Sequence, residues 1–304
     1  MTTWSDGAVT EWEARGHHIE VDGHQVFVVD VGPDHAGPET EAGPAPEPLV
    51  IVHGFPTSSF DFAGLTADLS RDRRVVLVDL LGFGLSAKPD RHYTMALQAD
   101  VVAGAVAAVG LNRFALLTHD MGDTVGGELL ARDLDGAWPL EITRRVVTNG
   151  SIYIEMANLT AGQLMLLDLP DERGPEGPGP ELLDASLRAT LAPANQHIGM
   201  RGHAELVCHA GGDALLPRTI RYIEERRANE RRFTGAIETH PSPLHVVWGP
   251  EDPIAVASMA QRLVDTRTAS GLPEPTLTWI DGAGHYPQIE APEAFNAAVR
   301  AALD

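Results

Sequence analysis

The segment from residue 114 to residue 134 constrains this 304-residue chain most, because it predicts a strand, a sharp turn and a helix in direct succession. Residues 114–117 are a short apolar run typical of a buried strand, and apolar residues recur at helical spacing from Thr124 to Leu134. The turn between them reads Thr-His-Asp-Met-Gly, with Asp120 at its apex. Small residues on both sides of such an apex are typical of a nucleophile elbow, so Asp120 occupies the place of a nucleophile.

Two later segments supply the partners that such an elbow needs. Residues 244–249 predict a buried strand that runs into Glu251 and Asp252. Residues 277–280 predict a further strand, which runs into a glycine-rich loop with His285. Nucleophile, acid and histidine in this order along the chain are typical of α/β-hydrolases. Upstream, residues 50–56 predict a strand that enters a turn with Phe55, which fits an oxyanion loop.

Four blocks, residues 53–56, 79–86, 119–123 and 284–290, together resemble the α/β-hydrolase superfamily in its epoxide hydrolase and haloalkane dehalogenase branch. The resemblance implies an α/β fold: a mostly parallel eight-stranded sheet with helices on both faces and an inserted helical cap. The family's acid lies three residues after the glycine of a Trp-Gly pair, which favours Asp252 over Glu251. The resemblance also implies that the backbone N–H groups of Phe55 and Met121 form the oxyanion hole.

The alternation of predicted elements agrees with that fold. A hairpin over residues 18–31 opens the series, an exposed loop follows at residues 33–48, and strands then alternate with helices as far as residue 148. Such alternation favours a parallel sheet that is covered on both faces. From about Ser151 the strands stop and helical segments dominate. We therefore expect a core domain of residues 1–150 and 238–304, and a cap of residues 151–237.

Composition limits the partners and the compartment. A formal net charge of −21 argues against nucleic acid and anionic membranes as partners, and no apolar run approaches the ~20 residues that span a bilayer. The single cysteine and the lack of a visible signal peptide favour a cytoplasmic protein. We expect a small-molecule substrate and no cofactor, and the resemblance allows a homodimer. The arginine-rich segment 218–232 predicts a solvated helix face paired with glutamates.

The aspartate suggests a specific chemistry. A carboxylate is already ionised at neutral pH, and its attack on a saturated carbon that carries a leaving group forms an alkyl ester on the enzyme. His285, oriented by Asp252, would then activate the water that hydrolyses this ester. The oxyanion would develop on Asp120 itself, next to the N–H groups of Phe55 and Met121.

The group that leaves the attacked carbon distinguishes haloalkane dehalogenases from epoxide hydrolases. Haloalkane dehalogenases hold the halide with side-chain N–H donors, but the chain has Met121 and Phe55 at the relevant positions and no tryptophan in residues 151–237. Epoxide hydrolases use cap tyrosines as proton donors, and the resemblance implies this role for Tyr222 and, as its partner, Tyr153. The sequence thus predicts an epoxide hydrolase. The alternatives are a dehalogenase with an atypical halide site and a non-catalytic ligand-binding protein.

Asp123 and a group of histidine, glutamate and cysteine residues in the cap are expected to have structural roles and not catalytic or metal-binding ones. Asp123 is expected to cap the N-terminal turn of the helix after the elbow. The cap residues His203, Glu205, Cys208 and His209 lack the paired spacing of a metal site, so no metal is expected there.

Overall fold

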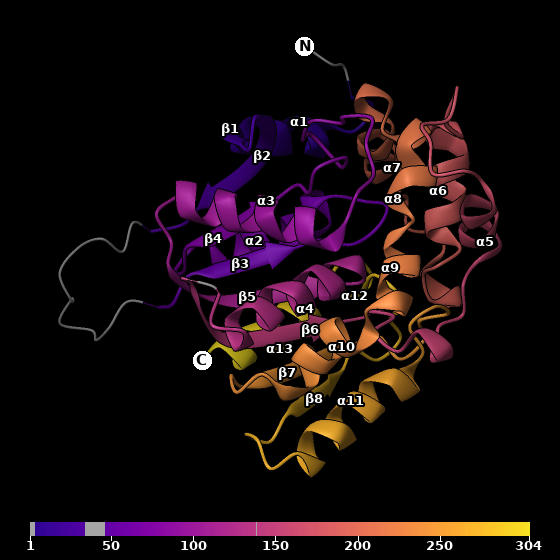
Figure 1. Ribbon diagram of the computed structural model, residues 1–304. Coiled ribbons are helices and arrows are strands. Elements are labelled where there is room, and N and C mark those ends of the chain that lie inside the picture. Colours follow the sequence, from indigo (N-terminus) through magenta and orange to yellow (C-terminus); the bar gives the residue numbers. More distant parts are fainter. Residues whose placement is uncertain (1–3, 34–45, 138) are drawn as a thin grey trace.

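A single eight-stranded sheet forms the centre of the computed structural model, which describes residues 4–33, 46–137 and 139–304 (Figure 1). Its strands are β1 (His17–Val21), β2 (His24–Val31), β3 (Leu49–Val52), β4 (Val75–Val78), β5 (Arg113–His119), β6 (Glu141–Thr148), β7 (Leu244–Trp248) and β8 (Thr276–Trp279), in the order β1-β2-β4-β3-β5-β6-β7-β8. β2 pairs antiparallel with β1 and β4, and all other pairs are parallel. The predicted mostly parallel sheet is confirmed.

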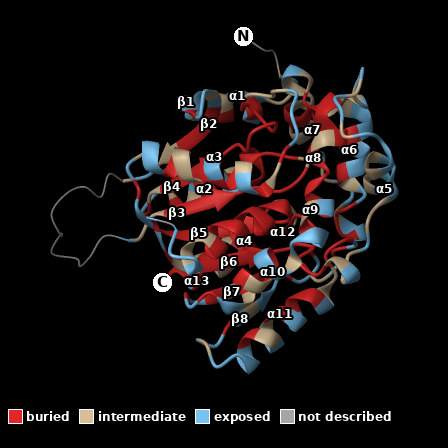
Figure 2. Cartoon of the chain, viewed as in Figure 1, coloured by how far each residue is buried: buried red, intermediate tan, exposed pale blue. Residues whose placement is uncertain are grey.

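Both faces of the sheet are buried, as Figure 2 shows for its central strands. Alternate residues of one strand enter opposite clusters: Val50 and Val52 belong to one, Leu49 and Ile51 to the other. This alternation follows from the two-residue period of a strand, and it explains why β3 and β4 are apolar without interruption.

Helices cover each of the two clusters. The first contains residues of α3 (Met95–Ala108), α4 (Met121–Leu134), α10 (Glu230–Thr239) and α11 (Ala257–Ala269); the second contains residues of α1 (Gly7–Arg15), α2 (Ala63–Leu69) and α13 (Pro292–Leu303). The short helix α12 (Pro287–Glu290) follows the loop that carries His285. The expectation of helices on both faces is confirmed.

Helix α1 corrects the prediction that the hairpin is the first element. The helix contributes only Val9 and Trp12 to the core, so its sequence has too few apolar residues for a helical period to be visible. Asp6 caps it by accepting a hydrogen bond from the Ala8 N–H at 2.9 Å. Most of the loop predicted at residues 33–48 lies outside the described residues.

Between β6 and β7 the chain is helical, as expected for a cap. This region contains α5 (Ala161–Asp168), α6 (Gly179–Arg188), α7 (Arg201–Cys208), α8 (Leu216–Thr219) and α9 (Tyr222–Ala228), which Figure 1 shows grouped on one side of the core. The predicted cap boundary after residue 237 falls inside α10. That helix lies on α4 so closely that a Cβ at Gly127 would stand 2.7 Å from the carbonyl oxygen of Phe233. The exact division into core and cap stays a prediction.

None of the described helices is both long enough and apolar enough to cross a membrane.

Candidate active site

Asp120 lies between β5 and α4 in a backbone conformation that few residues other than glycine adopt, with φ 49° and ψ −113°. The surrounding turn is tightly packed. A Cβ at Gly122 would stand 2.4 Å from the carbonyl oxygen of Val52, and one at Gly54 would stand 2.7 Å from the Cβ of Asp120. Such a conformation costs about 1–3 kcal/mol and persists only where its surroundings hold it. The strand and helix predicted around residues 118–122 thus hold Asp120 at their junction.

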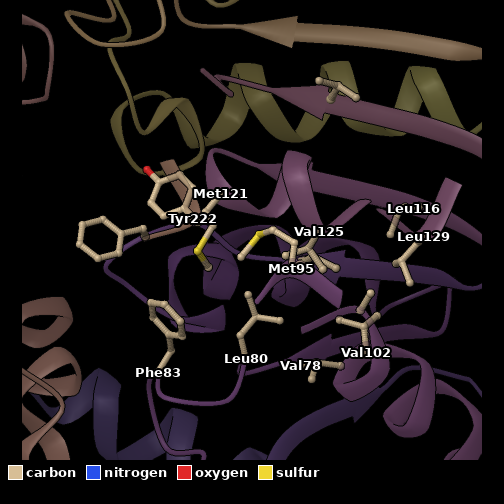
Figure 3. Close-up of a cluster of buried hydrophobic side chains, with 14 of the residues drawn as sticks. Val78, Leu80, Phe83, Met95, Val102, Leu116, Met121, Val125, Leu129 and Tyr222 are labelled. Atoms are coloured by element: carbon tan, nitrogen blue, oxygen red, sulfur yellow. The ribbon is translucent and has the colours of Figure 1, made fainter. Parts of the chain in front are cut away.

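The predicted oxyanion loop reaches the Asp120 carboxylate. The backbone N–H of Phe55 donates to Asp120 Oδ2 at 2.9 Å, and both residues are buried. Met121 is the first residue of α4, and its side chain lies in the core cluster drawn in Figure 3. The structure brings Phe55 to the carboxylate; the donation by the Met121 N–H stays a prediction.

His285 and Asp252 form a buried pair. Nδ1 of His285 donates to Asp252 Oδ2 at 2.8 Å, and the other carboxylate oxygen of Asp252 accepts from the N–H groups of Ile254 and Ala255 at 2.7 and 3.0 Å. Glu251, the alternative acid, is exposed. Asp252 is therefore the acid that contacts His285.

A residue not anticipated from the sequence, Asn149, completes this group. Its side-chain N–H donates to Asp252 Oδ2 at 2.8 Å, and its carbonyl accepts from the Gly249 N–H at 2.9 Å. Asn149 immediately follows β6, is fully buried and has φ 47°. A polar residue directly after a buried strand, of a type that tolerates positive φ, was the available signal.

Charge around His285 favours its protonated form. Burial lowers the pKa of its imidazole, but the opposing effects of Asp252, through charge and hydrogen bond, and of the Asp120 charge outweigh burial and raise the pKa to about 9. The neighbouring imidazole of His119 has a lowered pKa, chiefly because of burial, and its Nε2 donates to the carbonyl of His285 at 2.8 Å. His119 thus holds the histidine loop against the elbow.

The two tyrosines expected from the cap have different surroundings. Tyr222, in α9, is buried, and burial together with the Asp120 charge raises the pKa of its phenol. Its ring centroid lies 5.6 Å from that of Phe55. Tyr153 instead donates its hydroxyl to Glu238 Oε1 at 2.7 Å, in a separate open depression on the outside of α10. The structure therefore brings Tyr222, and not Tyr153, to the site.

A pocket of about 440 Å³ lies under the cap next to these groups. Phe55, His285 and Tyr286 line it from the core, and residues of α5 and α6 line it from the cap. Its lining is mostly apolar, and neither Asp120 nor Tyr222 is part of it. Phe55 connects them to the pocket, because it contacts both. Tyr286, whose ring lies 5.0 Å from that of His285, is a second phenol that the sequence did not single out.

Two expectations about charged residues are wrong. The arginine-rich segment is not a uniformly solvated face, because Arg221 and Arg226 are buried. Asp123 does not cap α4: its Oδ1 accepts from the Thr118 hydroxyl, and its Oδ2 has no partner. Burial, the largest influence, raises the pKa of Asp123 well above the usual aspartate range. Both errors have one cause, since burial of a charged group depends on elements that are remote in sequence.

Residues 49–298 match the α/β hydrolase family. The chain belongs to this family. It is 35% identical to the protein named "Putative hydrolase LipZ" of Mycobacterium tuberculosis, over 97% of this chain and 98% of that protein. It is also 30% identical to the mesoderm-specific transcript homolog protein of Homo sapiens, over 95% of this chain and 85% of that protein. The His-Asp-Met-Gly-Asp elbow and residues 221–227 predict a resemblance to this second relative, and the match over 302 residues confirms it.

A comparison with a solved structure agrees with the α/β-hydrolase fold. A thermophilic esterase from Thermogutta terrifontis matches with a TM-score of 0.73, over 94% of this chain and 97% of that one, at 19% identity. Membership of the family identifies the chain as a hydrolase. Its substrate has to be argued from its own residues.

Proposed function

We propose that this α/β-hydrolase opens epoxides to vicinal diols through a covalent ester on Asp120. The observation that carries the proposal is the carboxylate at the elbow, which accepts the Phe55 N–H next to the His285–Asp252 pair. A carboxylate in this place forms a stable alkyl ester, whereas its attack on an ester carbonyl yields a mixed anhydride.

In the first step Asp120 attacks a ring carbon. Oδ2 is held by Phe55, so Oδ1 is the oxygen that forms the new bond. The ring C–O bond breaks, and the phenol of Tyr222 gives its proton to the ring oxygen. Because burial raises the pKa of Tyr222, the phenol remains protonated until the alkoxide forms.

In the second step water hydrolyses the ester. His285 takes a proton from the water, Asp252 stabilises the imidazolium, and the hydroxide attacks the Asp120 carbonyl carbon. Oδ2 becomes the oxyanion, within reach of the Phe55 N–H. Collapse passes the proton of the added hydroxyl to the departing alkoxide, which releases the diol and restores the carboxylate. The proton held by the His285 imidazolium returns through solvent to the Tyr222 phenolate, so both groups regain their resting states. The imidazole is neutral more readily at this stage, because esterification has removed the Asp120 charge that raises its pKa.

Features of the pocket support an epoxide over a halide as the reacting group. Of the described residues that line the pocket, none is a tryptophan or an asparagine that could donate an N–H to a halide. The haloalkane alternative therefore lacks the donors that dehalogenases commonly use, and Gln163 is the side-chain amide among these lining residues.

The test is a substrate panel combined with a trapping variant. Purified protein is incubated with styrene-type and aliphatic epoxides, haloalkanes and activated esters, while diol, halide and acid are measured. We expect diol only from the epoxides. His285→Gln should accumulate an adduct whose mass equals that of the epoxide, and His245→Gln is the control. Halide release alone would support the dehalogenase. No turnover, with ligand binding retained in Asp120→Ala and His285→Ala, would support a binding protein.

A further inference from the structure

Arg226 is a buried cation directly behind the nucleophile elbow. It belongs to α9 of the cap and is 1% exposed. Its Nε donates to Thr124 Oγ1 at 2.6 Å, Nη1 donates to the Ser151 carbonyl at 2.6 Å, and Nη2 donates to the carbonyl of Asp120 itself at 3.3 Å. The guanidinium therefore connects the cap, the first turn of α4 and the backbone of Asp120.

None of these three hydrogen bonds goes to a carboxylate. A buried charge without a compensating partner is costly, so a negative charge close by must balance it. The Arg226 charge acts on the carboxyl groups of Asp123 and Glu230, and its guanidinium contacts the backbone of Asp120. Burial raises the pKa of both Asp123 and Glu230 and favours their neutral forms. Because Arg226 also donates to the Asp120 backbone, the Asp120 carboxylate is the charge that we take to balance it.

We propose that Arg226 is a positioning residue whose charge balances Asp120 and speeds hydrolysis of the enzyme ester more than its formation. This inference rests on the proposed covalent mechanism. In the resting enzyme, Asp120 and Arg226 together are neutral. Esterification removes the negative charge and leaves Arg226 unbalanced, and the tetrahedral oxyanion of the second step restores the balance. The Arg226 charge thus disfavours the enzyme ester relative to the resting carboxylate before it and the tetrahedral oxyanion after it.

The same side chain also positions the cap phenol. Tyr222 and Arg226 are four residues apart on α9, and the Arg226 Cζ lies 5.1 Å from the centroid of the Tyr222 ring. Because Arg226 is fixed to Thr124 and Ser151, it holds this turn of α9 against the elbow.

The test separates the two chemical steps. Rapid-quench experiments with intact-protein mass spectrometry measure the rates of ester formation and hydrolysis in single turnovers of an epoxide. Arg226→Gln removes the charge and keeps hydrogen-bonding capacity; Arg226→Lys keeps the charge; Arg227→Met removes an exposed arginine next to it on α9. We expect Arg226→Gln to slow hydrolysis by roughly 10- to 100-fold more than formation, so that the ester accumulates.

The outcomes distinguish charge from structure. Arg226→Lys and Arg227→Met should keep the wild-type ratio of the two rates. Thr124→Val, which removes a partner but no charge, should lower thermal stability and leave the ratio unchanged. The inference is overturned if Arg226→Gln and Arg226→Lys change the ratio equally, or if neither changes it. If Arg226→Gln does not fold while Arg226→Lys does, Arg226→Met takes its place. This variant should then slow ester hydrolysis more than ester formation, and an unchanged ratio of the two rates would overturn the inference. Absence of any ester in the wild type would instead overturn the proposed function.

Discussion

Asn149 and Asp252 form a hydrogen bond of 2.8 Å, and the acceptor atom, Asp252 Oδ2, is the same oxygen that accepts Nδ1–H of His285. The amide of Asn149 also contacts the carbonyls of Gly249 and Gly284 at 3.2 Å each. One side chain at the end of β6 thus fixes both the loop that carries the acid and the loop that carries the histidine. His285 is therefore oriented by a hydrogen-bond network that includes Asn149, and not by Asp252 alone.

Asn149→Ala should therefore affect both stability and the second chemical step. The substitution leaves buried partners of the amide unsatisfied and places alanine at φ 47°. We expect a loss of about 1–3 kcal/mol in the free energy of unfolding. Ester hydrolysis should slow while ester formation stays near its wild-type rate. Urea unfolding and single-turnover kinetics measure the two effects, with exposed Gln261→Ala as the control. Unchanged stability would contradict the role of Asn149.

The raised pKa of His285 predicts how stability depends on pH. A group whose pKa is higher in the folded state stabilises the fold fully below its unfolded pKa, and the stabilisation is lost as pH rises through the folded value. For His285 this window runs from its ordinary value of 6.5 to about 9. The loss over the window should be roughly 3 kcal/mol. Asp252→Asn removes the main cause and should flatten the profile. Equal slopes in both proteins, measured by urea unfolding across this range, would refute the assignment.

The two cap tyrosines should differ in activity. Tyr222→Phe removes the phenol next to the elbow, so ester formation from an epoxide should slow by about 10²- to 10⁴-fold, the usual size of general acid catalysis. Tyr153→Phe should leave this rate unchanged, because its hydroxyl contacts Glu238 outside the pocket. Single-turnover rates of both variants decide the point. If Tyr222→Phe remains fully active, the pocket-lining Tyr286 becomes the remaining phenol to test by substitution with phenylalanine.

The residues that could be predicted from the sequence are those with a strong local pattern. Asp120 stands between an apolar strand and an amphipathic helix, Phe55 and Asp252 each follow a buried strand, and His285 follows the more exposed β8. Parallel strands bring the ends of such segments to one edge of the sheet, so their spatial meeting follows from the order of elements. The eight-stranded sheet could be predicted for the same reason.

The residues that could not be predicted act through distant contacts. Arg226 reaches Thr124 and Ser151, which are far from it in sequence, so its helix looks like a solvated charged face. Tyr153 follows a strand near the start of the cap, and only the fold shows that its hydroxyl faces Glu238. Helix α1 has too few buried residues for a visible period. Local patterns do not reveal which charged or phenolic groups the tertiary fold buries.

The measurement that tests the central claim most directly follows oxygen from water into Asp120. Under single-turnover conditions in water enriched in ¹⁸O, hydrolysis of an ester at the Asp120 carbonyl must leave one heavy oxygen in that carboxylate. Mass spectrometry of the peptide that contains residue 120 should show a gain of one ¹⁸O in the enzyme and an unlabelled diol. A labelled diol with an unlabelled Asp120 would show that water attacks the substrate directly, and would contradict the covalent mechanism.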